Sequence, residues 1–283
     1  MRDTPLYIGL TTLPSRIGRI RDTIESLLSQ TLVPDRIFIS IPARSVRENR
    51  GYVLPEWLKG GLSPRVEVVH CSEDYGPGTK VLGCLPRISQ PGCLIVVDDD
   101  LKYSPVVMQR LYEAQRSDQG SSFSFFVYKL GPFPIGQGAD GFSFYTPNLA
   151  GIEDFARVAL RNRAAFVTDD LWVSLFLRTR GIRVRSLRFL LAPGEAVYEQ
   201  TYDHPNQLRH LTGELERQTA MSAGMRYLAG SGLLDARLRF AHWLWQLPGF
   251  TFCENQLRRL LGPLVRKRRL KSARGARDNQ RAA

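Results

Sequence analysis

The chain has 283 residues, of which 43% are hydrophobic and 23% are charged, a composition typical of globular proteins rather than of disordered or fibrous chains. Its net charge is +12, but residues 256–283 hold ten Lys or Arg residues and one Asp, so this segment supplies +9 of it. No apolar run approaches 18 residues, so we expect no membrane-spanning helix, and a basic surface for a partner is expected only in that segment.

The first residues of the chain and its cysteines indicate the cellular compartment. Residues 1–5 lead directly into a strand-like run, which is unlike a secretory signal. Cys71, Cys84, Cys93 and Cys253 show neither CxxC spacing nor a dense framework. We therefore expect reduced thiols and a cytoplasmic location.

Apolar runs that predict strands alternate with segments that predict helices along the first part of the chain. Strands are expected at residues 6–12, 36–41, 65–69 and 93–97, and helices at residues 14–30, 79–88 and 104–116, the last capped by Ser104. This alternation predicts an α/β fold with a mostly parallel sheet flanked by helices. In such sheets ligands bind beyond the carboxyl ends of the strands.

The second part of the chain is less regular. Residues 128–142 are rich in glycine and aromatic side chains, which suits either a loop that closes on a ligand or a plain hairpin. Thr168 is the expected N-cap of a helix that ends near Arg180, and residues 182–185 predict a late strand. From Pro205 onward the pattern is helical. We expect a sheet domain over residues 1–204, a helical extension over 205–255 and a basic tail over 256–283.

Three adjacent carboxylates, Asp98, Asp99 and Asp100, follow the buried strand at residues 93–97. Adjacent like charges in an ordered site need a positive partner. In an extended chain Asp98 and Asp100 point to one side and Asp99 to the other. Two carboxylates on one side suit Mg²⁺, which takes one or two protein carboxylates and completes its shell with water and substrate phosphates. The pattern indicates a metal–diphosphate site, with a solvated acidic turn as the alternative.

A tight loop, Asp-Tyr-Gly-Pro-Gly-Thr-Lys, occupies residues 74–80 before a predicted helix. Backbone N–H groups at the helix start and the ammonium group of Lys80 would suit a phosphate. The Gly-Lys-Ser/Thr order of a Walker A loop is absent. An ordinary turn with a solvated lysine is the alternative.

Two further carboxylates, Asp169 and Asp170, stand in the first turn of the helix that Thr168 begins. The helix dipole favours acids there, so a structural role is one interpretation. The functional interpretation is a carboxylate that accepts a proton from an attacking hydroxyl group.

These segments, in this order, resemble those of GT-A-type glycosyltransferases, in particular bacterial enzymes of the family-2 type. The resemblance covers roughly residues 6–190 and rests on the order and spacing of several motifs. The matching segments are residues 12–16, 26–30, 74–80, 96–100, 138–145 and 168–170.

The resemblance implies a GT-A fold, a nucleotide-sugar donor such as a UDP- or GDP-sugar, and a divalent cation, Mn²⁺ or Mg²⁺. Asp100 would ligate the cation, and Asp98 and Asp99 would help to hold the ribose and the metal. Other implied donor contacts lie on two segments. They are Pro14 and Arg16 at the nucleotide edge, and Asp74 and Lys80 near the base and diphosphate.

The resemblance also implies a general base and a further metal ligand. Asp170 matches the base of inverting members, whose usual pattern is Thr-Glu-Asp. The middle residue here is Asp169, so both aspartates stay candidates for the base. Some GT-A enzymes use a late histidine as a metal ligand, and His204 is the candidate here, with a structural or surface role as the alternative.

The expected function is metal-dependent sugar transfer to a hydroxyl group of a growing surface polysaccharide or a lipid-linked glycan. A nucleotidyltransferase is an alternative, but such enzymes often carry a Gly-rich basic loop where this chain has Leu-Pro-Ser-Arg. A nucleic-acid binder acting through the tail is a second alternative. The nearly neutral remainder of the chain and its acidic cluster make nucleic acid an unlikely partner.

Aromatic residues between positions 240 and 252 precede the basic run at residues 258–271. Aromatic side chains beside basic ones suit an anionic membrane surface, so residues 240–271 are a candidate membrane contact at the inner face of the plasma membrane. The alternative is a packed helix pair followed by a solvated tail.

Overall fold

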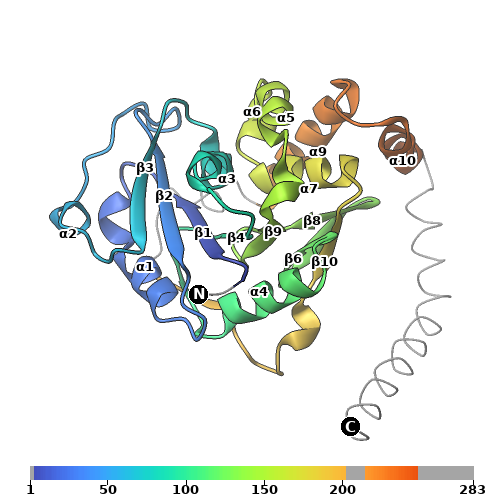
Figure 1. The fold of residues 1–283 in the computed structure, drawn as a ribbon. Coiled ribbons are helices and arrows are strands. Elements are labelled where there is room, and N and C mark those ends of the chain that lie inside the picture. Colours follow the sequence, from blue (N-terminus) through green and yellow to red (C-terminus); the bar gives the residue numbers. More distant parts are fainter. Residues whose placement is uncertain (1–2, 202–213, 248–283) are drawn as a thin grey trace, which may run out of the picture. The chain divides into compact units, whose positions relative to one another are not determined.

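The computed structural model describes residues 3–201 and 214–247 (Figure 1). The chain divides into two compact units, Met1–Asp235 and Ala236–Ala283. The boundaries expected after residues 204 and 255 lie at or within the residues outside the described ranges, and they stay predictions.

Seven strands of the first unit form one mixed sheet in the order β10-β6-β9-β4-β1-β2-β3. Their bounds are β1 Leu6–Thr11, β2 Arg36–Pro42, β3 Val66–Cys71, β4 Cys93–Val96, β6 Ser121–Ser124, β9 Phe142–Tyr145 and β10 Arg183–Ser186. The strands β1 to β4 run parallel, as do β6 and β10, whereas β9 is antiparallel to both of its neighbours. The mostly parallel α/β sheet expected from the sequence is therefore confirmed.

Helices cover both faces of this sheet, with α1 and α4 on one side and α3 and α7 on the other (Figure 1). The described residues of the first unit include the helices α1 Arg21–Leu28, α2 Glu56–Lys59, α3 Thr79–Leu82, α4 Val107–Ser117, α5 Ile152–Ala159, α6 Arg163–Phe166, α7 Asp169–Thr179 and α9 Glu214–Gly230. Short 3₁₀ turns add η1 Ile17–Arg19, η2 Gly76–Gly78, η3 Leu85–Arg87, η4 Thr146–Leu149 and η5 Arg188–Leu190. Two small antiparallel pairs lie outside the sheet, β5 Leu101–Tyr103 with β11 Tyr198–Gln200, and β7 Val127–Leu130 with β8 Phe133–Gly136.

The two faces of β1 show why the sheet accepts helices on both sides. Ile8 and Leu10 belong to a buried cluster with Ile24 of α1. Gly9 faces the other way, and a Cβ atom there would lie 2.3 Å from the carbonyl oxygen of Lys80. Glycine at this position lets the backbone of α3 lie directly against β1.

Two helix starts differ from the sequence prediction. The helix expected from residue 14 begins as a 3₁₀ turn at Ile17, because Ser15 donates its N–H and hydroxyl groups to Glu48 and stays in a turn. The predicted cap of α4 was wrong. The Ser104 hydroxyl donates 2.6 Å to the carbonyl oxygen of Ala196, and α4 starts later, at Val107.

The directions of the strands gather several loops at one edge of the sheet. The carboxyl ends of β1 to β4 meet there because these strands are parallel. Since β9 is antiparallel to β4, the segment at residues 137–141 that precedes β9 reaches the same edge. The sheet thus brings together segments that are far apart in the sequence.

The second unit contributes one described helix, α10 Ala236–Gln246. The helical character expected after residue 205 is confirmed for α9 and α10. In the described parts of the chain, no helix has the length and apolar character needed to cross a bilayer.

Candidate active site

A cleft lies at the edge of the sheet where the strands β1 to β4 end, and its wall is unusually rich in charge. The basic side chains that line it are Arg16, Arg47 and Lys80. The acidic side chains that line it are Asp74, Asp98, Asp99 and Asp100. Because the three cations nearly balance the four carboxylates, a ligand that carries a diphosphate would need an added cation to keep the charges balanced.

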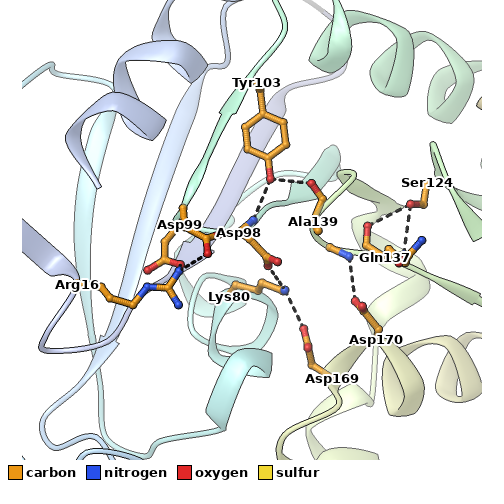
Figure 2. A network of polar contacts seen from close by, with 12 residues as sticks. Arg16, Lys80, Asp98, Asp99, Tyr103, Ser124, Gln137, Ala139, Asp169 and Asp170 are labelled. Atoms are coloured by element: carbon orange, nitrogen blue, oxygen red, sulfur yellow. Dashed lines mark hydrogen bonds and ion pairs between the residues drawn. The ribbon is translucent and has the colours of Figure 1, made fainter. Parts of the chain in front are cut away.

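The three adjacent aspartates lie in a turn rather than in a strand. The strand β4 ends at Val96, and Asp99 and Asp100 form the turn that leads into β5. The alternation expected for an extended chain is therefore wrong. Asp99 and Asp100 both pair with Arg16. Asp98 points instead to Lys80 (Figure 2).

Arg16 is the positive partner of two of these carboxylates. Its guanidinium group pairs with Asp99 and lies 2.8 Å from Asp100. Thr12 also donates its hydroxyl group to Asp99. Burial raises the pKa of Asp99 to about 6, the charge of Arg16 acts against this rise, and the neighbouring Asp100 adds to it.

Lys80 joins the aspartate turn to the start of α7. Its side chain is only 4% exposed, and its Nζ atom lies 2.8 Å from Asp98 and 3.0 Å from Asp169 (Figure 2). Burial alone would lower the pKa of Lys80, but the charges of Asp169 and Asp98 outweigh it and hold this pKa well above its ordinary value. The ammonium group is therefore charged and shared between two parts of the site.

The two aspartates at the start of α7 have different partners. Asp169 is buried and pairs with Lys80, whereas Asp170 accepts a hydrogen bond of 2.9 Å from the N–H group of Gly138. Burial raises the pKa of Asp170, and the charge of Asp169 raises it further. Thr168 precedes the helix as expected, but its hydroxyl group donates to Ala164 and does not cap α7.

The segment at residues 137–141 is hydrogen-bonded to Asp170 directly and to Asp98 through Tyr103. The buried hydroxyl group of Tyr103 donates to the Ala139 carbonyl and accepts from the Asp98 N–H group, both at 3.0 Å (Figure 2). A Cβ atom on Gly138 would lie 2.5 Å from the Nζ atom of Lys80. The preceding residues form the hairpin β7–β8, so the glycine-rich region is a hairpin followed by a short segment at the site.

Asp74 holds its own loop together. One carboxylate oxygen accepts from the Gly76 N–H group and the other from the Val46 N–H group, each at 2.7 Å. Tyr52, from the same β2–α2 connection as Val46, donates its hydroxyl group to the Thr12 carbonyl. These bonds join three segments around the cleft.

Pro14 lies in the turn beside Leu13, which lines the cleft, but Pro14 itself is not part of the lining.

The carboxylate oxygens of the aspartate turn, residues 98–100, suit a hard divalent cation. Asp98 and Asp100 supply carboxylate oxygens, and the Asp98 side chain is 38% exposed at the cleft. In the described ranges no three His, Cys, Asp or Glu side chains are grouped to hold a metal ion. Asp98 and Asp100 pair with different cations, but both line the same cleft. Mg²⁺ needs only one or two protein carboxylates when substrate phosphates complete its shell, so these residues fit a cation that binds together with a diphosphate. His204 lies outside the described residues.

Several residues of the site were not among those singled out from the sequence. Thr12 donates to Asp99 across 87 positions and Gly138 donates to Asp170 across 32. Tyr103 accepts from the nearby Asp98 and donates to Ala139 across 36 positions. For Gly138, the glycine-rich segment was a signal. Thr12 ends an expected strand and opens the matching segment at residues 12–16, whereas no sequence signal marks Tyr103. Only the folded sheet shows which residues the two side chains contact.

No family model matches the sequence, and no curated protein matches it. Among solved structures, S. aureus TarS 1–349 is similar with a TM-score of 0.51 and 13% identity, over 88% of this chain and 72% of that one. The same fragment in complex with UDP gives 0.49 and 13%, over 91% and 75% of the two chains. The Pyrobaculum calidifontis mannosyltransferase PcManGT, in complex with GDP-Man and Mn²⁺, gives 0.47 and 12%, over 94% and 87%. The protein has the fold of GT-A glycosyltransferases.

Proposed function

We propose that the protein is a glycosyltransferase that moves a sugar, a hexose in our proposal, from a nucleoside diphosphate to an acceptor hydroxyl group. The observation that carries this proposal is the charged cleft at the ends of β1 and β4, with a carboxylate of α7 beside it. In open α/β sheets, ligands bind at this edge. The GT-A fold makes sugar transfer the activity that fits this edge best.

The aspartate turn would hold the leaving group. Asp98 and Asp100 would hold a divalent cation, Mn²⁺ or Mg²⁺, whose charge would stabilise the departing diphosphate. Arg16 keeps Asp99 and Asp100 in place. Arg47 lines the same cleft and adds positive charge for an anionic donor such as a UDP- or GDP-sugar.

Asp170 is the better candidate for the base. Asp169 is held by Lys80, whereas Asp170 has a raised pKa that suits a group which must take up a proton. In the proposed reaction, Asp170 takes the acceptor's hydroxyl proton while the acceptor oxygen bonds to the anomeric carbon. The bond from that carbon to the diphosphate oxygen breaks, and the nucleoside diphosphate leaves. Direct displacement would invert the anomeric centre.

A nucleotidyltransferase is the weaker candidate. It would release pyrophosphate from a nucleoside triphosphate, and the turn after β1 lacks the glycine-rich basic loop expected for that reaction. The acceptor in our proposal is a surface polysaccharide or a lipid-linked glycan, and the protein acts in the cytoplasm.

The test is the release of nucleoside diphosphate from a panel of UDP- and GDP-sugars with Mn²⁺ and a glycan acceptor mixture. Asp100→Ala should lower turnover by about 100-fold or more, because it removes a cation ligand. Asp22→Ala, an exposed aspartate of α1, is the matched control and should keep full activity. Release of pyrophosphate from a nucleoside triphosphate, or full activity of Asp100→Ala, would contradict the proposal.

A further inference from the structure

The helix α10 exposes a stripe of large apolar side chains. Phe240 is 58% exposed and Trp243 55%, and Leu247 just after the helix is 38% exposed. With 3.6 residues per turn, these three positions fall within about 60° of one another. The rings of Phe240 and Trp243 stack with their centroids 5.7 Å apart. The stripe is therefore a continuous surface.

This stripe differs from the other exposed apolar residues in the described part of the chain. Val46 and Val53 are single residues of the β2–α2 connection, and Phe189 and Leu190 belong to the short 3₁₀ turn η5; small exposed apolar groups of this kind are normal on protein surfaces. On α10 the opposite side is also apolar, since Leu238 is buried and Trp245 is partly buried. A helix with apolar side chains on two opposite sides is normally buried on both of them. The exposed stripe therefore needs a partner.

Charge around the stripe indicates which partner this is. Arg237 and Arg239 are exposed on α10 and flank the stripe on its two sides. The sequence that follows adds ten Lys or Arg residues and one Asp over residues 256–283. Tryptophan beside basic side chains suits the boundary between lipid headgroups and acyl chains, where an apolar ring is buried and cations face anionic headgroups.

We infer that α10 is a docking surface for an anionic lipid bilayer, with Phe240, Trp243 and Leu247 entering the headgroup region. The basic residues on and after the helix supply the attraction to anionic lipid. This surface shares no residue with the charged cleft, and its test needs neither donor nor acceptor. Vesicle binding and sugar transfer can therefore succeed or fail independently.

The test is co-sedimentation of the full chain with vesicles made of equal parts phosphatidylcholine and phosphatidylglycerol. We expect binding to these vesicles and little binding to phosphatidylcholine alone. The double variant Phe240→Ser/Trp243→Ser should lower the partition coefficient by about tenfold or more, because it removes the apolar contact. Phe189→Ser, which changes a side chain 78% exposed on η5 of the first unit, is the matched control and should bind like the parent protein.

Lipids brominated on their acyl chains give a second readout. Their quenching of tryptophan fluorescence should fall in Trp243→Phe and persist in Trp245→Phe, since Trp245 lies on the other side of the helix. Absence of vesicle binding, or equal binding by the double variant, would overturn the inference. A change from dimer to monomer in the double variant, measured by light scattering without vesicles, would assign the stripe to a second copy of the chain instead.

Discussion

The two groups of carboxylates at the site are neutralised to different degrees. The turn at the end of β4 has three carboxylates and contacts two cations, Arg16 and Lys80. The start of α7 has two carboxylates and shares only one of these cations, Lys80, through Asp169. Charge at the turn is thus shared with two cations, whereas the pKa of Asp170 is raised by burial and by the charge of Asp169, against the opposing charge of Lys80. In our proposal the turn binds the divalent cation and Asp170 takes up the proton.

The largest effect is expected from removing the cation that the two groups share. Lys80→Met would leave Asp98 and Asp169 without their ammonium partner in a buried place. Because breaking a buried ion pair typically costs about 3–5 kcal/mol, we expect a loss near the lower end of that range, since Asp98 is partly exposed. Urea unfolding followed by circular dichroism measures this change.

The matched control is Lys59→Met. Lys59 pairs with Glu56 on the surface of α2, and such exposed pairs contribute roughly 0–1 kcal/mol. If Lys80→Met and Lys59→Met lowered the free energy of unfolding by the same small amount, the conclusion that Lys80 neutralises both Asp98 and Asp169 would be wrong.

A smaller effect is expected from moving Lys80 without removing it. In Gly138→Ala, the new methyl group would meet the Nζ atom of Lys80 at 2.5 Å, and the flexible side chain would move away. We expect the free energy of unfolding to fall by about 1 kcal/mol, and kcat to fall by about tenfold through lost orientation of the carboxylates.

Gly230→Ala is the control for Gly138→Ala, because a Cβ atom on this helical glycine would meet nothing within 4 Å. Its kcat should equal that of the parent protein. An unchanged kcat in Gly138→Ala would show that the position of Lys80 does not matter for the reaction.

The smallest expected effect is a shift in pH dependence. A base must be deprotonated to act, so a raised pKa of Asp170 means that kcat/KM rises with pH up to a higher pH than for an ordinary aspartate. Asp169→Asn removes a neighbouring negative charge, so the pKa of Asp170 falls and the acidic limb moves to lower pH, by about one unit. The measurement is kcat/KM against pH for both proteins. The base would be assigned to Asp169 if the acidic limb of the Asp169→Asn profile moved to higher pH, or if that limb were present in the parent protein and absent from Asp169→Asn.

The central strands could be predicted because they are continuous apolar runs. The apolar run at residues 93–97 predicts a strand covered on both faces of a parallel sheet, and β4 lies there at Cys93–Val96. The edge of the sheet at which the charged cleft lies followed from the order of strands and helices. The position of β9 could not be predicted, since its pairing with β4 and β6 depends on contacts between distant residues.

The side chains of the site were predictable as a set but not in their pairing. Asp98 and Asp100 were expected on one side because the strand was assumed to continue, and the turn after Val96 placed Asp99 with Asp100 instead. Lys80 was expected near a phosphate. Its burial between Asp98 and Asp169 depends on the approach of α3 and α7, which no local pattern in the sequence specifies.

The ion pair between Arg16 and Asp99 has a consequence for folding. It joins residues 83 positions apart, and the bond from Thr12 to Asp99 spans 87. Contacts over such separations form slowly, because the loop between the partners must close before they meet. We therefore expect the cleft to form late in folding, together with the pairing of β1 and β4.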